Sequence, residues 1–89
     1  MASDKIIYNK RAICSSFNIS NEMLLDMVSW GIASPSGSSP DKWLFSHSDY
    51  ERIGRAIRFN KDLDINVPGA ALALELLDEL GRIRNSIRH

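Results

Sequence analysis

Residues 20–50 read SNEMLLDMVSWGIASPSGSSPDKWLFSHSDY, and this stretch carries the signals that decide the fold. Ser20 has the character of a helix N-cap, and Glu22 stands in the first turn, where the helix dipole favours a carboxylate. Gly31 is a natural stop for this helix. Between these signals, apolar residues recur at helical spacing: Met23, Leu24, Met27, Val28 and Trp30. We therefore expect a short amphipathic helix.

Turn-forming residues and a second helix start come next. Residues 36–41 (SGSSPD) separate residues 32–35 from residues 42–45, which is the pattern of a short β-hairpin. Ser46 and Asp49 then form an S-x-x-D capping box, with Asp in place of the usual Glu or Gln. A helix, a hairpin and a capped helix in this order indicate a winged helix-turn-helix, an architecture that reads DNA.

A further helix is expected before this stretch. Asn9 is its candidate cap and Ser16 its last residue, so only residues 17–19 separate it from the next helix, as in a helix-turn-helix. Residues 5–8 (KIIY) are β-branched and aromatic, which indicates a short strand.

The helix that follows the capping box has two distinct faces. Apolar residues mark its buried stripe: Tyr50, Ile53, Ala56 and Ile57. Basic residues occupy its wetter side: Arg52, Arg55, Arg58 and Lys61. This basic series is either a solvated face or a phosphate-contacting stripe, and both interpretations stay open. Residues 62–66 break the helical pattern.

Pro68 suits the first turn of a last helix that begins at Asn66 or Val67. Its apolar face consists of Leu72, Leu76, Leu80, Ile83 and Ile87, widened by Leu74 and Leu77. The spacing in its last part is that of a coiled-coil seam, but about two heptads are too few for a coiled coil. We therefore expect this face to pack against the core.

Composition narrows the class of protein. The 89 residues are enough for one domain over residues 1–89, and the 44% apolar content is ordinary for a globular protein. Eleven basic and eleven acidic residues cancel, whereas a dedicated nucleic-acid module usually has a basic excess. The single cysteine fits a reducing compartment, and no apolar run has the length of a membrane span. These features predict a cytoplasmic protein.

Residues suited to enzyme chemistry are sparse. His47 and His89 have no nearby cysteine or carboxylate cluster with metal-ligand spacing, and the sequence has no glycine-rich phosphate loop. Cys14 has apolar neighbours on its expected helix, which favours buried packing over a reactive thiol. We predict a protein that is not an enzyme and that uses no metal or cofactor.

The order of elements resembles the MerR-type winged helix domain. Residues 23–27 (MLLDM) and 31–35 (GIASP) fall where that family has its recognition helix and a G-L-L-x-P run. Residues 45–53 (FSHSDYERI) resemble its Y-S-E-E-D-L-E-R-L run. The family places an arginine and paired tyrosines on the recognition helix, but this chain has L-D-M at residues 25–27. Because the carboxylate of Asp26 would repel phosphate, DNA binding is not expected.

A narrower resemblance fits these departures: the chain resembles the CbpM-type chaperone modulators, which are MerR-like proteins. The resemblance depends on the order and spacing of several segments taken together. These segments are residues 18–22 with Leu24, Trp43-x-Phe45, residues 55–59 (RAIRF) and residues 62–78. The resemblance implies binding to the J-domain of a DnaJ-like, curved-DNA-binding co-chaperone. By covering the basic helix of that domain, the modulator would inhibit its stimulation of an Hsp70-class chaperone.

The acidic helix is the expected contact surface, since it offers charge complementarity at its rim and adaptable apolar contact at its centre. The candidate contact residues are Glu22, Met23, Asp26, Met27 and Trp30, with Asp62 and Asp64 as a second patch. Met23 and Met27 are equally well interpreted as core residues. A MerR-like DNA-binding regulator is the alternative function, and a homodimer through the last helix is left open.

Overall fold

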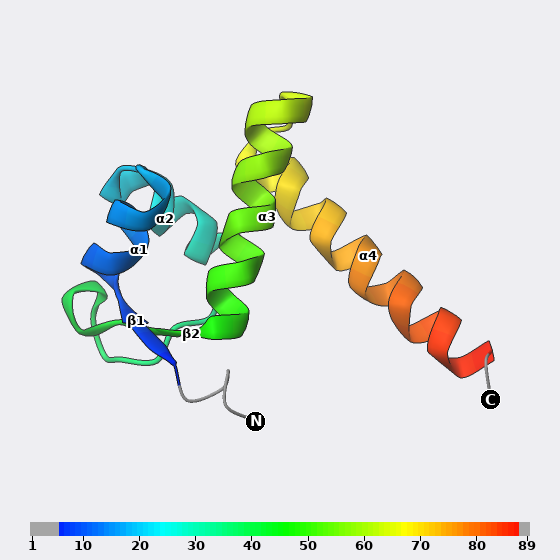
Figure 1. Cartoon of the computed structure of the whole chain (residues 1–89), viewed down its shortest axis with the longest axis horizontal. Helices are drawn as coiled ribbons and strands as arrows, with labels where there is room; N and C mark the ends of the chain where they lie inside the picture. The colour runs from blue at the N-terminus through cyan, green and yellow to red at the C-terminus, as the bar shows by residue number, and fades with distance from the viewer. Residues whose placement is uncertain (1–5, 88–89) are drawn as a thin grey trace.

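The computed structural model describes residues 6–87, which form a mainly α-helical fold with one small sheet (Figure 1). In chain order the elements are β1 (Ile7–Asn9), α1 (Lys10–Phe17), α2 (Asn21–Ser29), the 3-10 helix η2 (Pro40–Lys42), β2 (Leu44–Ser46), α3 (His47–Leu63) and α4 (Val67–Ile87). The predicted class, a MerR-like winged helix-turn-helix followed by a C-terminal helix, is confirmed. Lys5 of the predicted strand and His89 lie outside the described residues.

The predicted helix starts are confirmed by their caps. The side chains of Asn9 and Ser20 each accept a hydrogen bond from the backbone N–H three residues later, at 2.8 and 3.1 Å. Ser46 and Asp49 complete the capping box, because each side chain accepts from the other residue's backbone N–H, at 3.1 and 3.2 Å. These bonds satisfy N–H groups that have no partner within the helix, and each cap stabilises its helix by about 1 kcal/mol.

A residue with positive φ follows each helix of the helix-turn-helix formed by α1 and α2. Asn18 ends α1 with a φ of 54°, and Gly31 turns the chain out of α2 with a φ of 80°. Glycine adopts this conformation at little steric cost, and asparagine tolerates it better than most residues. The stop predicted at Gly31 is therefore confirmed.

The strand pairing differs from the predicted hairpin. β2 pairs antiparallel with β1, with Tyr8 opposite Phe45, and residues 32–35 form no strand. All that remains of the expected hairpin is one bridge, in which Ser36 and Leu44 exchange two hydrogen bonds of 2.9 and 3.0 Å. β1 takes the place beside β2 that the hairpin strand would have occupied, and Ile32 packs into the core instead.

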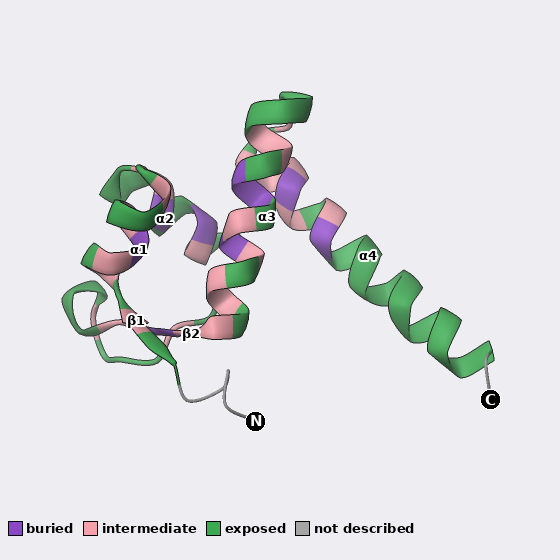
Figure 2. Ribbon diagram, in the orientation of Figure 1, coloured by how far each residue is buried: buried purple, intermediate pink, exposed green. Residues whose placement is uncertain are grey.

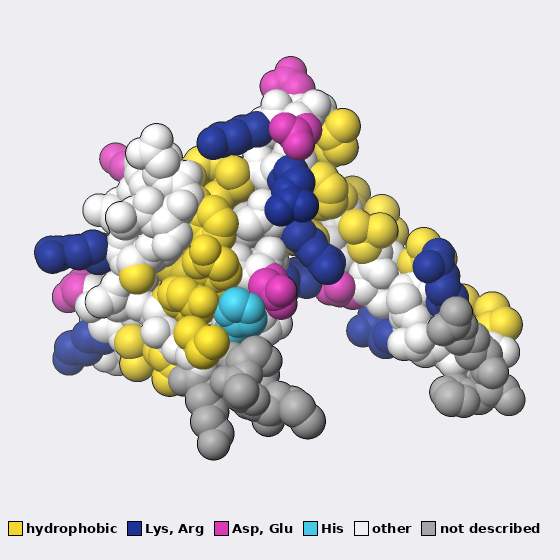
Figure 3. Space-filling model, viewed as in Figure 1, with side chains coloured by type: hydrophobic (Ala, Val, Ile, Leu, Met, Phe, Trp, Pro, Cys, Tyr) yellow, Lys and Arg dark blue, Asp and Glu magenta, His cyan; other side chains and the backbone are white. Residues whose placement is uncertain are grey.

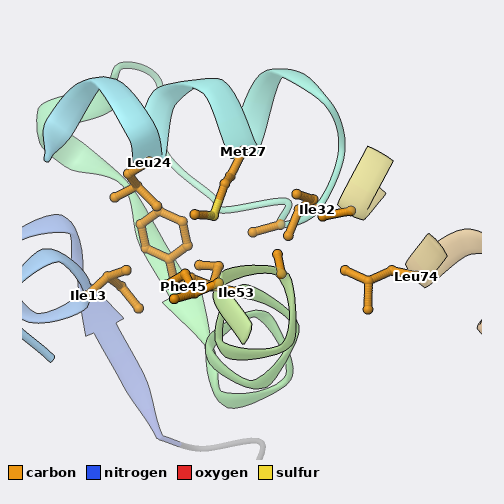
Figure 4. Packing of buried hydrophobic residues seen from close by; sticks show 11 residues of the cluster. Ile13, Leu24, Met27, Ile32, Phe45, Ile53 and Leu74 are labelled. Carbon is orange, nitrogen blue, oxygen red and sulfur yellow. The ribbon is translucent and has the colours of Figure 1, made fainter. Parts of the chain in front are cut away.

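Phe45 lies at the centre of a core of eleven buried apolar residues to which each of the four α-helices contributes. Figure 4 shows Leu24 and Met27 pointing from α2 toward Phe45 and Ile53, with Ile13 closing one side. The core consists of Ile13, Leu24, Met27, Ile32, Ala33, Phe45, Ile53, Ala56, Ile57, Ala70 and Leu74. Each large side chain buried in this way contributes about 2 kcal/mol of transfer free energy.

The expectation that the apolar face of α4 packs into the core is wrong. Only Ala70 and Leu74 of this helix are buried, and its later turns extend away from the other elements (Figures 1 and 2). Leu72, Leu76, Leu77, Leu80, Ile83 and Ile87 are exposed, at fractions from 48% to 77%. The spacing of these residues is that of a helical seam, but no other element among residues 6–87 covers it.

Arg52 joins three segments of the fold. Its Nε donates a 2.8 Å hydrogen bond to the carbonyl oxygen of Ile32, and its guanidinium pairs with Asp78 on α4 at 2.7 Å. Arg52 therefore belongs to the scaffold, whereas Arg55, Arg58 and Lys61 of the same basic series are exposed. No helix among residues 6–87 is both long and apolar enough to cross a membrane.

Candidate partner-binding groove

An open groove of about 820 Å³ lies between the outer face of α2 and the junction of α3 with α4. We call it the acidic groove. Its lining consists of Glu22, Met23, Leu25, Asp26, Ser29, Asn60 and Val67. Three elements thus meet at one surface that carries two carboxylates and several apolar side chains.

The period of α2 separates the groove residues from the core residues. Leu24 and Met27 point inward and have no exposed surface. Glu22 and Asp26 stand one turn apart on the outer face, with Leu25 beside them at 39% exposure. The burial of one face therefore fixes which side chains the other face presents.

The rim of the acidic groove is negatively charged and unneutralised. Glu22 and Asp26 are exposed, and neither forms an ion pair with any residue of the described chain. Like charges four residues apart on a helix destabilise it by about 0.2–0.5 kcal/mol. A cationic partner placed between the two carboxylates would relieve this repulsion.

The far wall of the acidic groove is held by hydrogen bonds at the turn between α3 and α4. The Asn60 side chain donates to the carbonyl of Ile65 at 3.0 Å, and the Asn66 side chain accepts from the backbone N–H of Gly69 at 2.8 Å. These bonds fix the position from which Val67 lines the groove. The surface is therefore formed before any partner arrives, which lowers the ordering cost of binding.

The structure brings together three of the residues that the sequence singled out, namely Glu22, Met23 and Asp26. Met27 was also predicted as a contact residue, but it is fully buried beneath α2 and presents no surface for contact. Trp30 is 53% exposed at the end of α2, outside the groove lining. Two more acidic residues, Asp62 in the last turn of α3 and Asp64 at its C-cap, are exposed beyond Asn60.

Sequence reasoning missed four lining residues. Leu25 had a usable signal, because it is an apolar residue on the polar side of an otherwise regular amphipathic helix. Ser29, Asn60 and Val67 had none, since their place in the groove depends on how α3 and α4 pack near α2.

Cys14 and His47, the residues considered for enzyme chemistry, both contact other residues of the fold. Burial raises the pKa of the Cys14 thiol, and the charge of Lys10 opposes this only in part, so the thiol stays protonated at neutral pH. A hydrogen bond of 3.0 Å joins the Tyr8 hydroxyl to Nδ1 of His47. Residues 6–87 contain no group of three His, Cys, Asp or Glu side chains placed to hold a metal ion.

The match to a family of known proteins agrees with this geometry. Residues 8–89 match the family described as MerR HTH family regulatory protein, and the chain belongs to this family. Within it, the chain is similar to chaperone modulatory protein CbpM of Pseudomonas entomophila, with 33% identity over 96% of this chain and 85% of that protein. The CbpM of Coxiella burnetii (strain Dugway 5J108-111) is 34% identical over 85% of this chain and 72% of its own length. The chain therefore belongs to the CbpM-type chaperone modulators, a family of regulators rather than of enzymes.

Proposed function

We propose that this protein binds the J-domain of a DnaJ-like co-chaperone and thereby prevents the J-domain from stimulating an Hsp70-class chaperone. The observation that carries the proposal is the acidic groove, which places Glu22 and Asp26 on the helix that MerR-type regulators use to read DNA. The naming of its relatives as chaperone modulatory proteins supports the same role. The protein would act as a single domain in the cytoplasm.

The mechanism is occupancy of a shared surface. A basic helix of the partner lies along the acidic groove, so its cations meet Glu22 and Asp26 while its apolar side chains contact Leu25 and Met23. Opposite charges at the rim guide the encounter and fix its orientation, and the apolar centre supplies contact area. While the helix is covered, the chaperone cannot reach it, so inhibition requires no catalytic group.

A stable complex needs more surface than the groove alone supplies. Specific interfaces bury about 800 Å² on each partner. We therefore include Trp30 and the acidic pair Asp62 and Asp64 as outer contacts on either side of the groove. Met27 has an indirect role in this arrangement, since it packs α2 onto the core.

Dimerisation through α4 is a further part of the proposal. A helix that stays in solvent does not require a continuous row of exposed apolar residues such as α4 has. A second copy of the chain would cover this row if the two α4 helices packed against each other. Two acidic grooves would then be carried by one assembly.

The alternative function, DNA binding, is separated from J-domain binding by two titrations. We expect the purified protein to bind an isolated J-domain and to lower the ATPase rate of the chaperone that the J-domain stimulates. A duplex of mixed sequence should bind weakly, because α2 has no Lys or Arg and Arg52 is already paired. Tight duplex binding that falls steeply with salt would reject the proposal in favour of a DNA-binding regulator.

A further inference from the structure

A second groove, of about 440 Å³, lies between the end of α1 and the first half of α3. We call it the arginine groove. Its lining consists of Phe17, Tyr50, Glu51, Gly54, Arg55 and Arg58, none of which lines the acidic groove. Figure 3 shows this face, with Lys and Arg side chains along α3 beside an apolar area.

The floor of the arginine groove is a stack of aromatic rings. Tyr50 lies between Tyr8 and Phe17, with ring centroids 4.5 and 4.8 Å away, and His47 stacks on Tyr50 at 5.8 Å. The hydrogen bond between Tyr8 and His47 fixes the outer rings of this stack. The floor is therefore rigid, half-buried and apolar, which suits it to receive one apolar or aromatic side chain.

Gly54 lets the Phe17 ring lie directly against α3 at this floor. A Cβ atom at this position would lie 3.3 Å from Cε1 of Phe17, so a larger side chain would cover the ring. Glycine is unfavourable within a helix, and its φ in α3 is not positive, so the backbone does not require it. Its evident consequence is that the Phe17 ring packs closely against α3.

Two arginines without partners border the floor. Arg55 and Arg58 are exposed, stand one turn apart on α3, and make no ion pair within residues 6–87. Arg52 and Arg82, by contrast, are both paired with carboxylates. Guanidinium groups bind carboxylates through parallel hydrogen bonds, so this edge of the groove is complementary to an anionic side chain.

We propose that the arginine groove binds an acidic peptide segment of a partner protein. An apolar or aromatic side chain of the segment rests on Phe17 and Tyr50, and its neighbouring carboxylates pair with Arg55 and Arg58. A nucleic acid fits less well, because only two arginines border the groove and the chain has no basic excess with which to neutralise a run of phosphates. The proposal is independent of J-domain binding: the two grooves take segments of opposite charge, so one molecule can hold both.

The test is binding of a short fluorescent peptide in which one phenylalanine is flanked on both sides by glutamates. We expect anisotropy titrations to show saturable binding that weakens about tenfold in the double variant R55E/R58E, because each reversal places a carboxylate against the peptide. The matched control R84E removes an exposed arginine of α4 and should leave binding unchanged. Circular dichroism of all variants checks that they are folded.

Three results would overturn the proposal. The first is no saturable binding to the wild-type protein. The second is equal binding of a peptide with lysines in place of the glutamates, or of one with alanine in place of the phenylalanine. The third is peptide affinity in R55E/R58E equal to that of the wild-type protein. J-domain binding by R55E/R58E is measured in parallel and should be unchanged, so failure here leaves the acidic groove intact.

Discussion

Arg52 illustrates how one side chain connects segments that are distant in the sequence. It is partly buried, donates to the backbone of Ile32, and pairs with Asp78 at the point where α4 leaves the core. An exposed ion pair alone contributes little, but the bond to a carbonyl from a partly buried guanidinium contributes more.

We expect Arg52→Gln to lower the free energy of unfolding by about 1–2 kcal/mol, because the Ile32 carbonyl and Asp78 lose their common donor. Urea denaturation followed by circular dichroism measures this change. The matched control is Arg55→Gln, which removes an exposed arginine of the same helix and should cost about 0.5 kcal/mol or less. Equal losses in the two variants would show that Arg52 has no special structural role.

The burial of Met27 could not be predicted from residue spacing alone. Both methionines of α2 fit an apolar stripe, and the sequence alone does not tell which one faces the core. The packing of Phe45 and Ile53 beneath the helix buries Met27 completely and leaves Met23 at the groove. The carboxylates, in contrast, were placed on the surface by their charge alone.

Among the secondary-structure elements, local sequence signals predicted the helices, whereas contacts between distant segments could not be predicted from such signals. The caps at Asn9, Ser20 and Ser46 are formed within a few residues, so sequence patterns predicted them correctly. The pairing of β1 with β2 joins segments separated by two α-helices and the 3-10 helix η2, and no turn signal between the strands predicts this pairing. Likewise, the apolar period of α4 predicts a covered face without indicating what covers it.

The turn before η2 depends on Gly37. This residue has a φ of 124°, and a Cβ atom there would lie 2.5 Å from the carbonyl oxygen of Lys42. We expect Gly37→Ala to destabilise the fold by about 2 kcal/mol or more, and to accelerate hydrogen exchange at Ser36 and Leu44, whose bridge closes the turn.

Gly81 provides the matched control. It lies in an exposed turn of α4, where an added Cβ would meet nothing within 4 Å. Gly81→Ala should therefore stabilise α4 by up to about 1 kcal/mol through helix propensity alone. Destabilisation by both substitutions to a similar extent would contradict the structural role of Gly37.

At the scale of the whole molecule, the apolar seam of α4 should determine the oligomeric state. We expect the wild-type chain to sediment as a dimer and the double variant L76E/L80E to sediment as a monomer, because two carboxylates would be buried in the seam. The control L63E changes an exposed leucine at the end of α3 and should remain dimeric. A wild-type monomer at high concentration would remove dimerisation from the proposed function.

Charge is balanced over the whole chain but unevenly distributed over its surface. Formal charges sum to zero, yet Glu22 and Asp26 border one groove while Arg55 and Arg58 border another. The zero net charge indicates that the protein is not a dedicated nucleic-acid module, but it does not indicate which surface contacts a partner. That information depends on the tertiary arrangement of α2, α3 and α4.

Charge reversal at Asp26 is the decisive test of J-domain binding at the acidic groove. Titration calorimetry with a purified J-domain should show that Asp26→Lys weakens binding about tenfold, or about 1.4 kcal/mol, and that a lysine-to-glutamate change in the partner's basic helix restores part of the loss. Asp41→Lys, the same charge change in η2 away from the groove, should leave affinity within about twofold. Unchanged J-domain affinity in Asp26→Lys, with no response to the partner's charge, would contradict binding at the acidic groove.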